Sequence, residues 1–357
     1  MIMRPTIVLL ALLLTTSLAA ADYGAPLTLP EAETAADPAV IEVDGTYYLY
    51  VTSSYVDIEC WASEDLVEWR YEGVVWAQAP AGAWNDRDVW APEVHTDGEY
   101  YYLYYAANMM IGVARAAAPT GPFVDVYDHP FVGGGYGGVN GLAIDAHVFR
   151  DDDDRLYFYF AGYQPFSVVR AARLSDMVTI EGEPTTLVKP GIVNWELFVA
   201  EAPWIVKHDG VYYLMYSGYG ADRVNYAVGY ATADDPLGPF AEYADNPILH
   251  QDIAAGFYGP GHNGTLVDPD GALRIVYHTK VAPTIGWDRQ IRLNDLCFTP
   301  AGRMYVGFDG CTQTDEDDDA ADDDAADDDD DGSADDDDPA ADSGQAADDE
   351  DGDGCGC

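Results

Sequence analysis

The sequence contains almost no lysine and little positive charge of any kind. Lysine occurs only as Lys189, Lys207 and Lys280, and all basic residues together number 16 against 64 acidic ones in 357 residues. A chain with a formal net charge of −48 lacks the basic surface that binding to a phosphate backbone requires. Nucleic acid is therefore not expected as a partner.

Long apolar runs are also missing. A membrane-spanning helix needs roughly 20 apolar residues, whereas the N-terminal run covers only Ile7 to Leu13 before Thr15 and Ser17 interrupt it. The N-terminus has the three parts of a secretory signal peptide: a basic start at Arg4, this short apolar run, and small residues that end at Ala21. We predict a signal peptide at residues 1–21 and a protein that is secreted or held at the cell surface.

Cysteine is scarce for an exported chain. Of five cysteines, only Cys60, Cys297 and Cys311 lie in the body of the sequence. They permit one disulfide in an oxidising compartment, but the sequence does not select the pair. Their spacing is not that of a metal site.

Residues 312–357 contain no basic residue and 23 of the acidic ones. Such a segment has too little apolar surface to offset the entropy of ordering, so we predict a disordered Asp-rich tail. A solvated spacer is favoured over calcium binding because the aspartates lack regular glycine spacing. The terminal Gly354-Cys355-Gly356-Cys357 resembles the opening of C-terminal sorting signals of the myxobacterial type, without their hydrophobic helix and arginine cluster. Surface attachment through these cysteines is an open alternative.

Helical periodicity is nearly absent from residues 22–311, but a β-type repeat runs through them. An Asp-containing turn followed by an aromatic strand begins at Asp44, Asp97, Asp153, Asp209 and Asp270, at intervals of 53, 56, 56 and 61 residues. A period near 50 with hairpin turns is typical of propeller blades. We predict an all-β five-bladed β-propeller with four-stranded antiparallel blades, type I′ hairpin turns at each Asp-Gly, and a monomer.

Acidic residues recur at the start of the inner strands. Aligning the five units brings the following stretches into register: Asp37-Pro38-Ala39-Val40, Ala91-Pro92-Glu93-Val94, Asp145-Ala146-His147-Val148, Glu201-Ala202-Pro203-Trp204 and His262-Asn263-Gly264-Thr265. Inner strands line the channel of a propeller, so three carboxylates and one imidazole should face a single pocket. Clustered like charges are costly without a role. Glycoside hydrolysis needs an acid, a base and a group that tunes the acid.

These motifs resemble family 43 of the glycoside hydrolases. The stretches that carry the resemblance are Ala36-Asp37-Pro38-Ala39-Val40, Trp90-Ala91-Pro92-Glu93-Val94, Ile144-Asp145-Ala146-His147-Val148-Phe149 and Glu201-Ala202-Pro203, over about residues 30–309. The family consists of five-bladed propellers that act on arabinose- and xylose-containing glycans. The resemblance implies that Asp37 is the general base, that Asp145 raises the pKa of the acid and orients it, and that Glu201 is the general acid. Ala146 and Ala202 replace the family's usual Pro and Gly, which puts fine specificity in doubt.

The resemblance also implies supporting residues. Trp90 and Arg289 should line the pocket, and His262 should help hold a calcium ion on the axis, with no cofactor required for the chemistry. Independently of the resemblance, Phe166 and Trp61 lie in loops between blades and could build substrate subsites, although core packing is favoured for Trp61. The structural alternative is core packing for Trp90, an ion pair for Arg289 and a neutral hydrogen-bonded ring for His262. Three further candidates are set aside for the pocket: Glu93 and His95, expected to point away from the axis, and Glu196.

The sequence thus predicts an exported, inverting, exo-acting glycosidase that releases terminal α-L-arabinofuranose from plant-type arabinan or arabinoxylan. A β-xylosidase or an endo-arabinanase of the same family remains an alternative. The alternative from another class is a non-catalytic carbohydrate-binding propeller.

Overall fold

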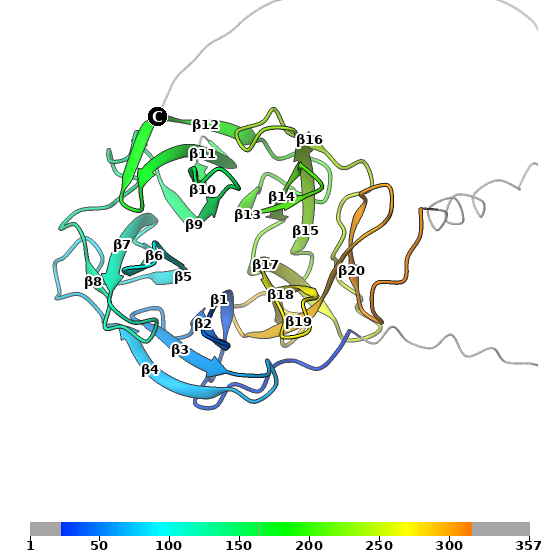
Figure 1. Cartoon of the computed structure of the whole chain (residues 1–357), viewed down its shortest axis with the longest axis horizontal. Helices are drawn as coiled ribbons and strands as arrows, with labels where there is room; N and C mark the ends of the chain where they lie inside the picture. Colours follow the sequence, from blue (N-terminus) through cyan, green and yellow to red (C-terminus); the bar gives the residue numbers. More distant parts are fainter. Residues whose placement is uncertain (1–22, 164, 316–357) are drawn as a thin grey trace, which may run out of the picture. The chain divides into compact units, whose positions relative to one another are not determined.

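The computed structural model describes residues 23–163 and 165–315, which form five four-stranded antiparallel sheets around a common centre (Figure 1). Each sheet uses four consecutive strands in their order along the chain. No helix occurs among the described residues. The predicted five-bladed propeller is confirmed, while the signal peptide and most of the Asp-rich tail lie outside the described residues.

The blades follow one another in sequence. The first two blades contain β1 (Ala36–Val43), β2 (Thr46–Thr52), β3 (Ile58–Ser63) and β4 (Arg70–Trp76), then β5 (Val89–Thr96), β6 (Tyr101–Ala107), β7 (Met110–Ala116) and β8 (Val124–Asp125). The third blade contains β9 (Ala143–Arg150), β10 (Leu156–Tyr163), β11 (Ser167–Asp176) and β12 (Thr179–Val188). The last two contain β13 (Glu201–His208), β14 (Val211–Gly218), β15 (Ala227–Ala233) and β16 (Ala241–Glu242), then β17 (Tyr258–Val267), β18 (Leu273–Lys280), β19 (Arg289–Phe298) and β20 (Met304–Gly307).

The hairpin turns differ between blades. Asp44-Gly45 and Asp209-Gly210 are two-residue turns in which both residues have positive φ, as the predicted type I′ geometry requires. At Asp97-Gly98, however, only the glycine has positive φ, because the loop between β5 and β6 is longer and the Asp97 carboxylate accepts backbone hydrogen bonds from Glu99 and Tyr100. The prediction of one turn type throughout is therefore wrong.

Hydrophobic cores fill the spaces between neighbouring blades. Leu49 and Trp61 of the first blade pack with Val276 and Ile291 of the last blade, which closes the ring. Trp61 is fully buried and its indole N–H donates to the Pro30 carbonyl, so core packing is confirmed as its role. The ring closes without a strand shared between the two ends of the chain.

A disulfide joins Cys297 of β19 to Cys311, and Cys60 is buried and free. This resolves the pairing that the sequence left open. Beyond the disulfide, Gln313 donates a backbone hydrogen bond to the Tyr305 hydroxyl. Within residues 23–163 and 165–315, no helix has the length and apolar character to cross a membrane.

Candidate active site

Each inner strand contains a β-bulge near its start. The first bulge residue has a positive φ in every blade: Asp37 (51°), Ala91 (49°), Asp145 (58°), Ala202 (51°) and His262 (47°). In each case two residues of the inner strand oppose one residue of its neighbour. A bulge bends its strand and redirects side chains. The repeated sequence pattern therefore marks, in each blade, one residue that the bulge turns toward the axis.

Neighbouring side chains satisfy the amide groups that the bulges free from the ladder. Thr52 accepts a hydrogen bond from the Ala91 amide at 2.9 Å, and Ser217 accepts one from His262 at 2.9 Å. The Ala202 amide donates to Oδ2 of Asp145 at 3.0 Å. All three bonds join adjacent blades and fix the bulges relative to one another.

The predicted register of Glu201 is wrong by one residue. Ala202, not Glu201, is the bulge residue of the fourth blade. Glu201 instead occupies the preceding, strand-paired position, which Trp90 and Ile144 occupy in their blades. Pro203 then aligns with the prolines of the first two blades, a pattern in the sequence that would have revealed the shift.

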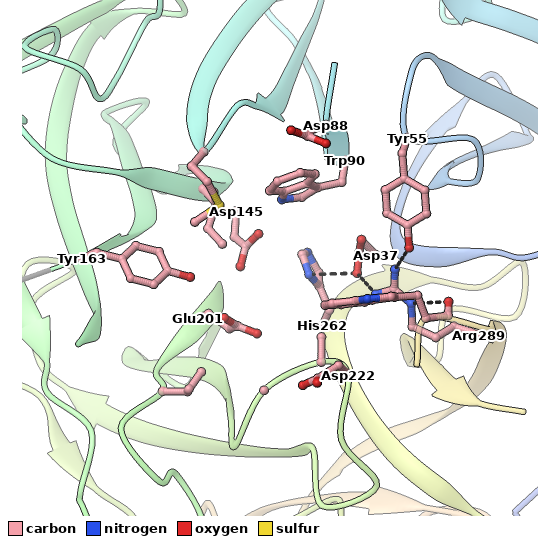
Figure 2. A pocket seen from close by; sticks show the side chains of 16 residues that line it. Asp37, Tyr55, Asp88, Trp90, Asp145, Tyr163, Glu201, Asp222, His262 and Arg289 are labelled. Atoms are coloured by element: carbon pink, nitrogen blue, oxygen red, sulfur yellow. Dashed lines mark hydrogen bonds and ion pairs between the residues drawn. The ribbon is translucent and has the colours of Figure 1, made fainter. Parts of the chain in front are cut away.

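The bulges surround a pocket of about 510 Å³ (Figure 2). Its lining includes six of the seven predicted site residues: Asp37, Trp90, Asp145, Glu201, His262 and Arg289. Phe166 does not line it; the residue is 42% exposed and its ring packs at a tilt against Phe198, with 4.8 Å between centroids. Figure 2 shows Asp145 and Glu201 opposite Asp37 and Arg289 across the pocket.

Asp37 is a buried carboxylate held by several donors. Its Oδ1 lies 3.0 Å from Nη1 of Arg289 and 3.3 Å from Nδ1 of His262, and its Oδ2 accepts a 2.7 Å hydrogen bond from Thr52. Burial alone would raise the pKa of Asp37, but the positive charge of Arg289, with smaller contributions from the neighbouring His262 and His278, holds it well below its usual range. Asp37 is therefore ionised at neutral pH.

Asp145 and Glu201 form a pair of carboxyl groups whose pKa values are raised, in contrast to that of Asp37. Burial raises the pKa of Glu201 to about 7, although a 3.0 Å hydrogen bond from the Tyr226 hydroxyl to Oε1 favours its charged form. Burial and the nearby Glu201 carboxylate raise the pKa of Asp145. Because two buried carboxylates repel each other when both are charged, the pair retains a proton near neutral pH.

Several lining residues were not predicted. Tyr55 accepts a 3.0 Å hydrogen bond from Nη2 of Arg289, and Tyr163, Asp222 and Trp287 are among the further residues that line the pocket. All four lie outside the inner strands: Tyr163 ends β10 and the others are in loops. The repeat pattern contains no information about such positions.

Glu196 has a structural role. It is fully buried, lies outside the pocket and accepts 2.8 Å hydrogen bonds from Tyr216 and Asn194. It anchors the loop that precedes β13, as expected for a carboxylate set aside from the chemistry.

The contacts of His262 do not form a calcium cage. Its Nδ1 faces Oδ1 of Asp37, and that oxygen is already bound by Arg289. Calcium prefers six to eight oxygen ligands, which the described neighbours of His262 do not supply. A calcium ion at His262 stays a prediction.

Comparison with known proteins places this pocket in a family. The profile of glycosyl hydrolases family 43 matches residues 31–304. The chain is 32% identical to the β-D-galactofuranosidase xynD of Aspergillus niger, over 75% of this chain and 81% of that protein. It is 29% identical to an extracellular exo-α-(1→5)-L-arabinofuranosidase of Streptomyces avermitilis, over 80% of this chain and 64% of that protein.

A solved structure gives the same result. The crystal structure of a thermostable family-43 glycoside hydrolase aligns with a TM-score of 0.71 and 32% identity, covering 81% of this chain and 97% of that one. The fold, the pocket and the sequence matches agree, and the chain is a glycosidase that belongs to glycosyl hydrolases family 43.

Proposed function

We propose that this protein is an inverting, exo-acting glycosidase that releases terminal α-L-arabinofuranose from arabinan or arabinoxylan. The observation that carries the proposal is the division of charge across one pocket. Asp37 is held ionised on one side, and the Asp145–Glu201 pair retains a proton on the other. An inverting glycosidase needs this combination of base and acid on opposite faces of the sugar.

In this mechanism Asp37 accepts a proton from a water molecule. Arg289 keeps the carboxylate charged but also makes it a weak base. The water becomes acidic as it bonds to the anomeric carbon, so a weak base accepts its proton late in the transition state. Room for that water requires about 6.5 to 9.5 Å between the Asp37 and Glu201 carboxyl groups, a separation that stays a prediction.

Glu201 protonates the departing glycosidic oxygen. A general acid works best when its pKa is close to the working pH, and burial places the pKa of Glu201 at about 7. Asp145 orients the acid indirectly, because it accepts the amide of Ala202, the residue that follows Glu201. Its proximity also disfavours the charged form of Glu201.

The choice of a furanoside rests on the relatives. One is named for β-D-galactofuranose and another for α-L-arabinofuranose. The two sugars share the same ring configuration and differ only in the exocyclic chain at C4. A pocket built for that ring supports arabinofuranose as substrate and makes β-D-galactofuranose a related candidate.

Export is part of the proposal. A relative that covers most of this chain is named as extracellular, and the residues preceding Asp22 have the composition of a signal peptide. Detection of the mature protein in the culture medium, with its N-terminus at Asp22, tests this directly.

Hydrolysis of four substrates side by side tests the activity. Aryl α-L-arabinofuranoside should be cleaved fastest, ahead of aryl β-D-galactofuranoside, aryl β-D-xylopyranoside and linear arabinan. Proton NMR of the first product should detect the inverted anomer. Fastest turnover of the xyloside would make the protein a β-xylosidase, internal cleavage of arabinan an endo-arabinanase, and binding without turnover a carbohydrate-binding propeller.

A further inference from the structure

A second group of convergent polar side chains lies outside the active-site pocket. Glu93 and His95 come from β5, and His147 comes from β9 of the next blade. Oε1 of Glu93 is 3.0 Å from Nδ1 of His147 and 3.2 Å from Nε2 of His95. None of the three lines the pocket, so the prediction that Glu93 and His95 do not serve that site agrees with their position.

The burial of this group leaves the negative charge of Glu93 in need of a compensating cation. Glu93 is 4% exposed and His147 is 3% exposed. Among the described residues, no lysine or arginine forms an ion pair with Glu93, and the two imidazoles are its only ion-pair partners. A buried carboxylate is costly unless a cation compensates it, and a metal ion is one such cation.

The three residues have the ligand set and spacing of a transition-metal site. One oxygen and two nitrogen atoms, one from each residue, lie within 4.8 Å of one another. Zinc bonds of about 2.0–2.1 Å in a tetrahedron place ligand atoms roughly 3.3 Å apart, close to the two measured separations. Two imidazoles with one carboxylate suit zinc, whereas calcium and magnesium prefer oxygen ligands.

We propose that Glu93, His95 and His147 bind one Zn²⁺ ion, with water in the fourth position. The His95 side chain is 28% exposed, so the ion has a route from solvent. On the far side of the His147 ring, Nε2 is buried without a hydrogen-bond partner among the described residues. The Nδ1 edge that faces Glu93 is thus the polar contact that holds the ring.

The ion would connect the inner strands of the second and third blades. His147 follows the bulge of Asp145 by two residues, and its ring packs on Trp204 at 4.1 Å between centroids. Trp204 in turn follows Glu201 by three residues in β13. A metal bridge from β5 to β9 would therefore stabilise the strands that present the carboxyl pair, without contacting substrate.

The test compares full-length wild-type protein with His95→Gln, a substitution at the most exposed of the three ligands. His250→Gln, at an exposed histidine far along the chain, is the matched control. Each protein is equilibrated with Zn²⁺, passed through gel filtration and analysed for bound metal. The Asp-rich tail is identical in all three, so any zinc that it binds cancels in the comparison.

Wild type and the His250 variant should each retain one more Zn²⁺ per chain than the His95 variant. At a 100-fold excess of Zn²⁺ over Kd, their Tm should rise by about 4 °C, with no rise for His95→Gln. Co²⁺ added to the wild type should give the strong visible absorption of a tetrahedral site. Equal zinc content in all three proteins, or a weak octahedral Co²⁺ spectrum in the wild type, would overturn the proposal.

Discussion

Nη1 of Arg289 lies 3.0 Å from Oδ1 of Asp37, a contact between the third strand of the last blade and the first strand of the first blade. Both side chains are buried, and Arg289 is additionally held by the Tyr55 hydroxyl. The point where the propeller closes is thus also the point where the proposed base is kept ionised. Ring closure and the charge state of Asp37 are physically coupled.

Replacing Arg289 with Gln should move the acidic limb of the pH–activity profile. Loss of the guanidinium charge leaves burial to raise the pKa of Asp37, so Asp37 becomes protonated at a higher pH. The kcat/KM should then begin to fall at a higher pH on acidification than in wild type, and should drop about 100-fold at its optimum. Arg70→Gln, at an exposed arginine, is the control and should leave the profile unchanged. An unshifted acidic limb in Arg289→Gln would show that Asp37 is not the titrating base.

Replacing Tyr226 with Phe should shift the alkaline limb of the pH–activity profile. Glu201 must be protonated to act, so the wild-type activity should fall as pH rises through about 7, the pKa of Glu201. The Tyr226 hydroxyl donates to Oε1 and favours the charged form, and its removal raises the pKa further. The alkaline limb of kcat/KM for aryl arabinofuranoside should therefore move to higher pH. Tyr230→Phe, outside the pocket, serves as a control, and a shift toward lower pH in Tyr226→Phe would contradict the assignment of the acid.

The repeat explains why so much of the fold and the site was predictable. Every blade repeats an inner strand, a turn and an aromatic strand, so the period predicts the number of blades. Because Asp37 and Asp145 occupy equivalent positions in the repeat, it also predicts that both side chains point toward the axis. Glu201 shows the limit of this reasoning. A bulge changes the register by one residue, and spacing alone does not reveal which of Glu201 and Ala202 carries the positive φ.

Contacts between blades were not predictable for a different reason. His278 of the last blade contacts Asp37 of the first although 241 residues separate them, and Arg289 contacts Asp37 across 252 residues. Such pairs depend on how adjacent sheets face each other, which no local pattern encodes. Phe166 was wrongly expected near the substrate, since its position in a loop does not determine whether it turns toward the pocket or packs against Phe198.

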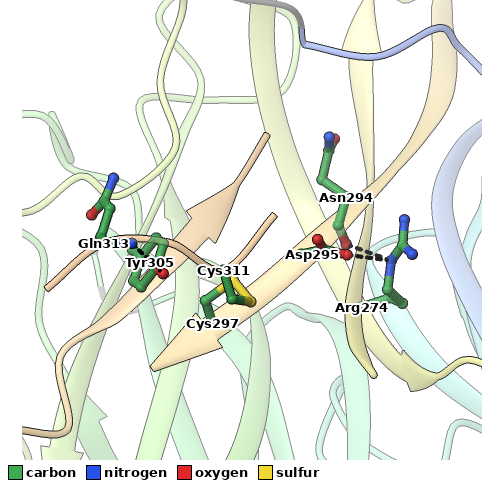
Figure 3. The surroundings of a disulfide bond; sticks show 7 residues. All are labelled: Arg274, Asn294, Asp295, Cys297, Tyr305, Cys311 and Gln313. Carbon is green, nitrogen blue, oxygen red and sulfur yellow. Dashed lines mark hydrogen bonds and ion pairs between the residues drawn. A yellow bond between two sulfur atoms is a disulfide. The ribbon is translucent and has the colours of Figure 1, made fainter. Parts of the chain in front are cut away.

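Removing the disulfide should destabilise the last blade. Cys297 and Cys311 enclose a loop with a sequence separation of 14, and the bond fixes the segment after β20 onto β19 (Figure 3). Closing a loop of that length stabilises a protein by about 3 kcal/mol through the entropy of the unfolded chain. Cys311→Ser should lower Tm by several degrees in thermal denaturation. Reductant should lower the Tm of wild type but not that of Cys311→Ser, and equal sensitivity of both would contradict this account.

The carboxyl pair should make the folded protein less stable as pH rises from about 4 to 7. Glu201 ionises near its ordinary pKa when unfolded but only at about 7 when folded. The folded state therefore binds more protons in this range, and the free energy of unfolding falls with pH. A pKa difference of about 2.5 corresponds to roughly 3 kcal/mol. Glu201→Gln cannot ionise, so its Tm relative to wild type should be higher at pH 8 than at pH 4. Glu68→Gln, at an exposed glutamate, should show no such change, and an equal Tm difference at both pH values for Glu201→Gln would mean that Glu201 ionises normally in the folded protein.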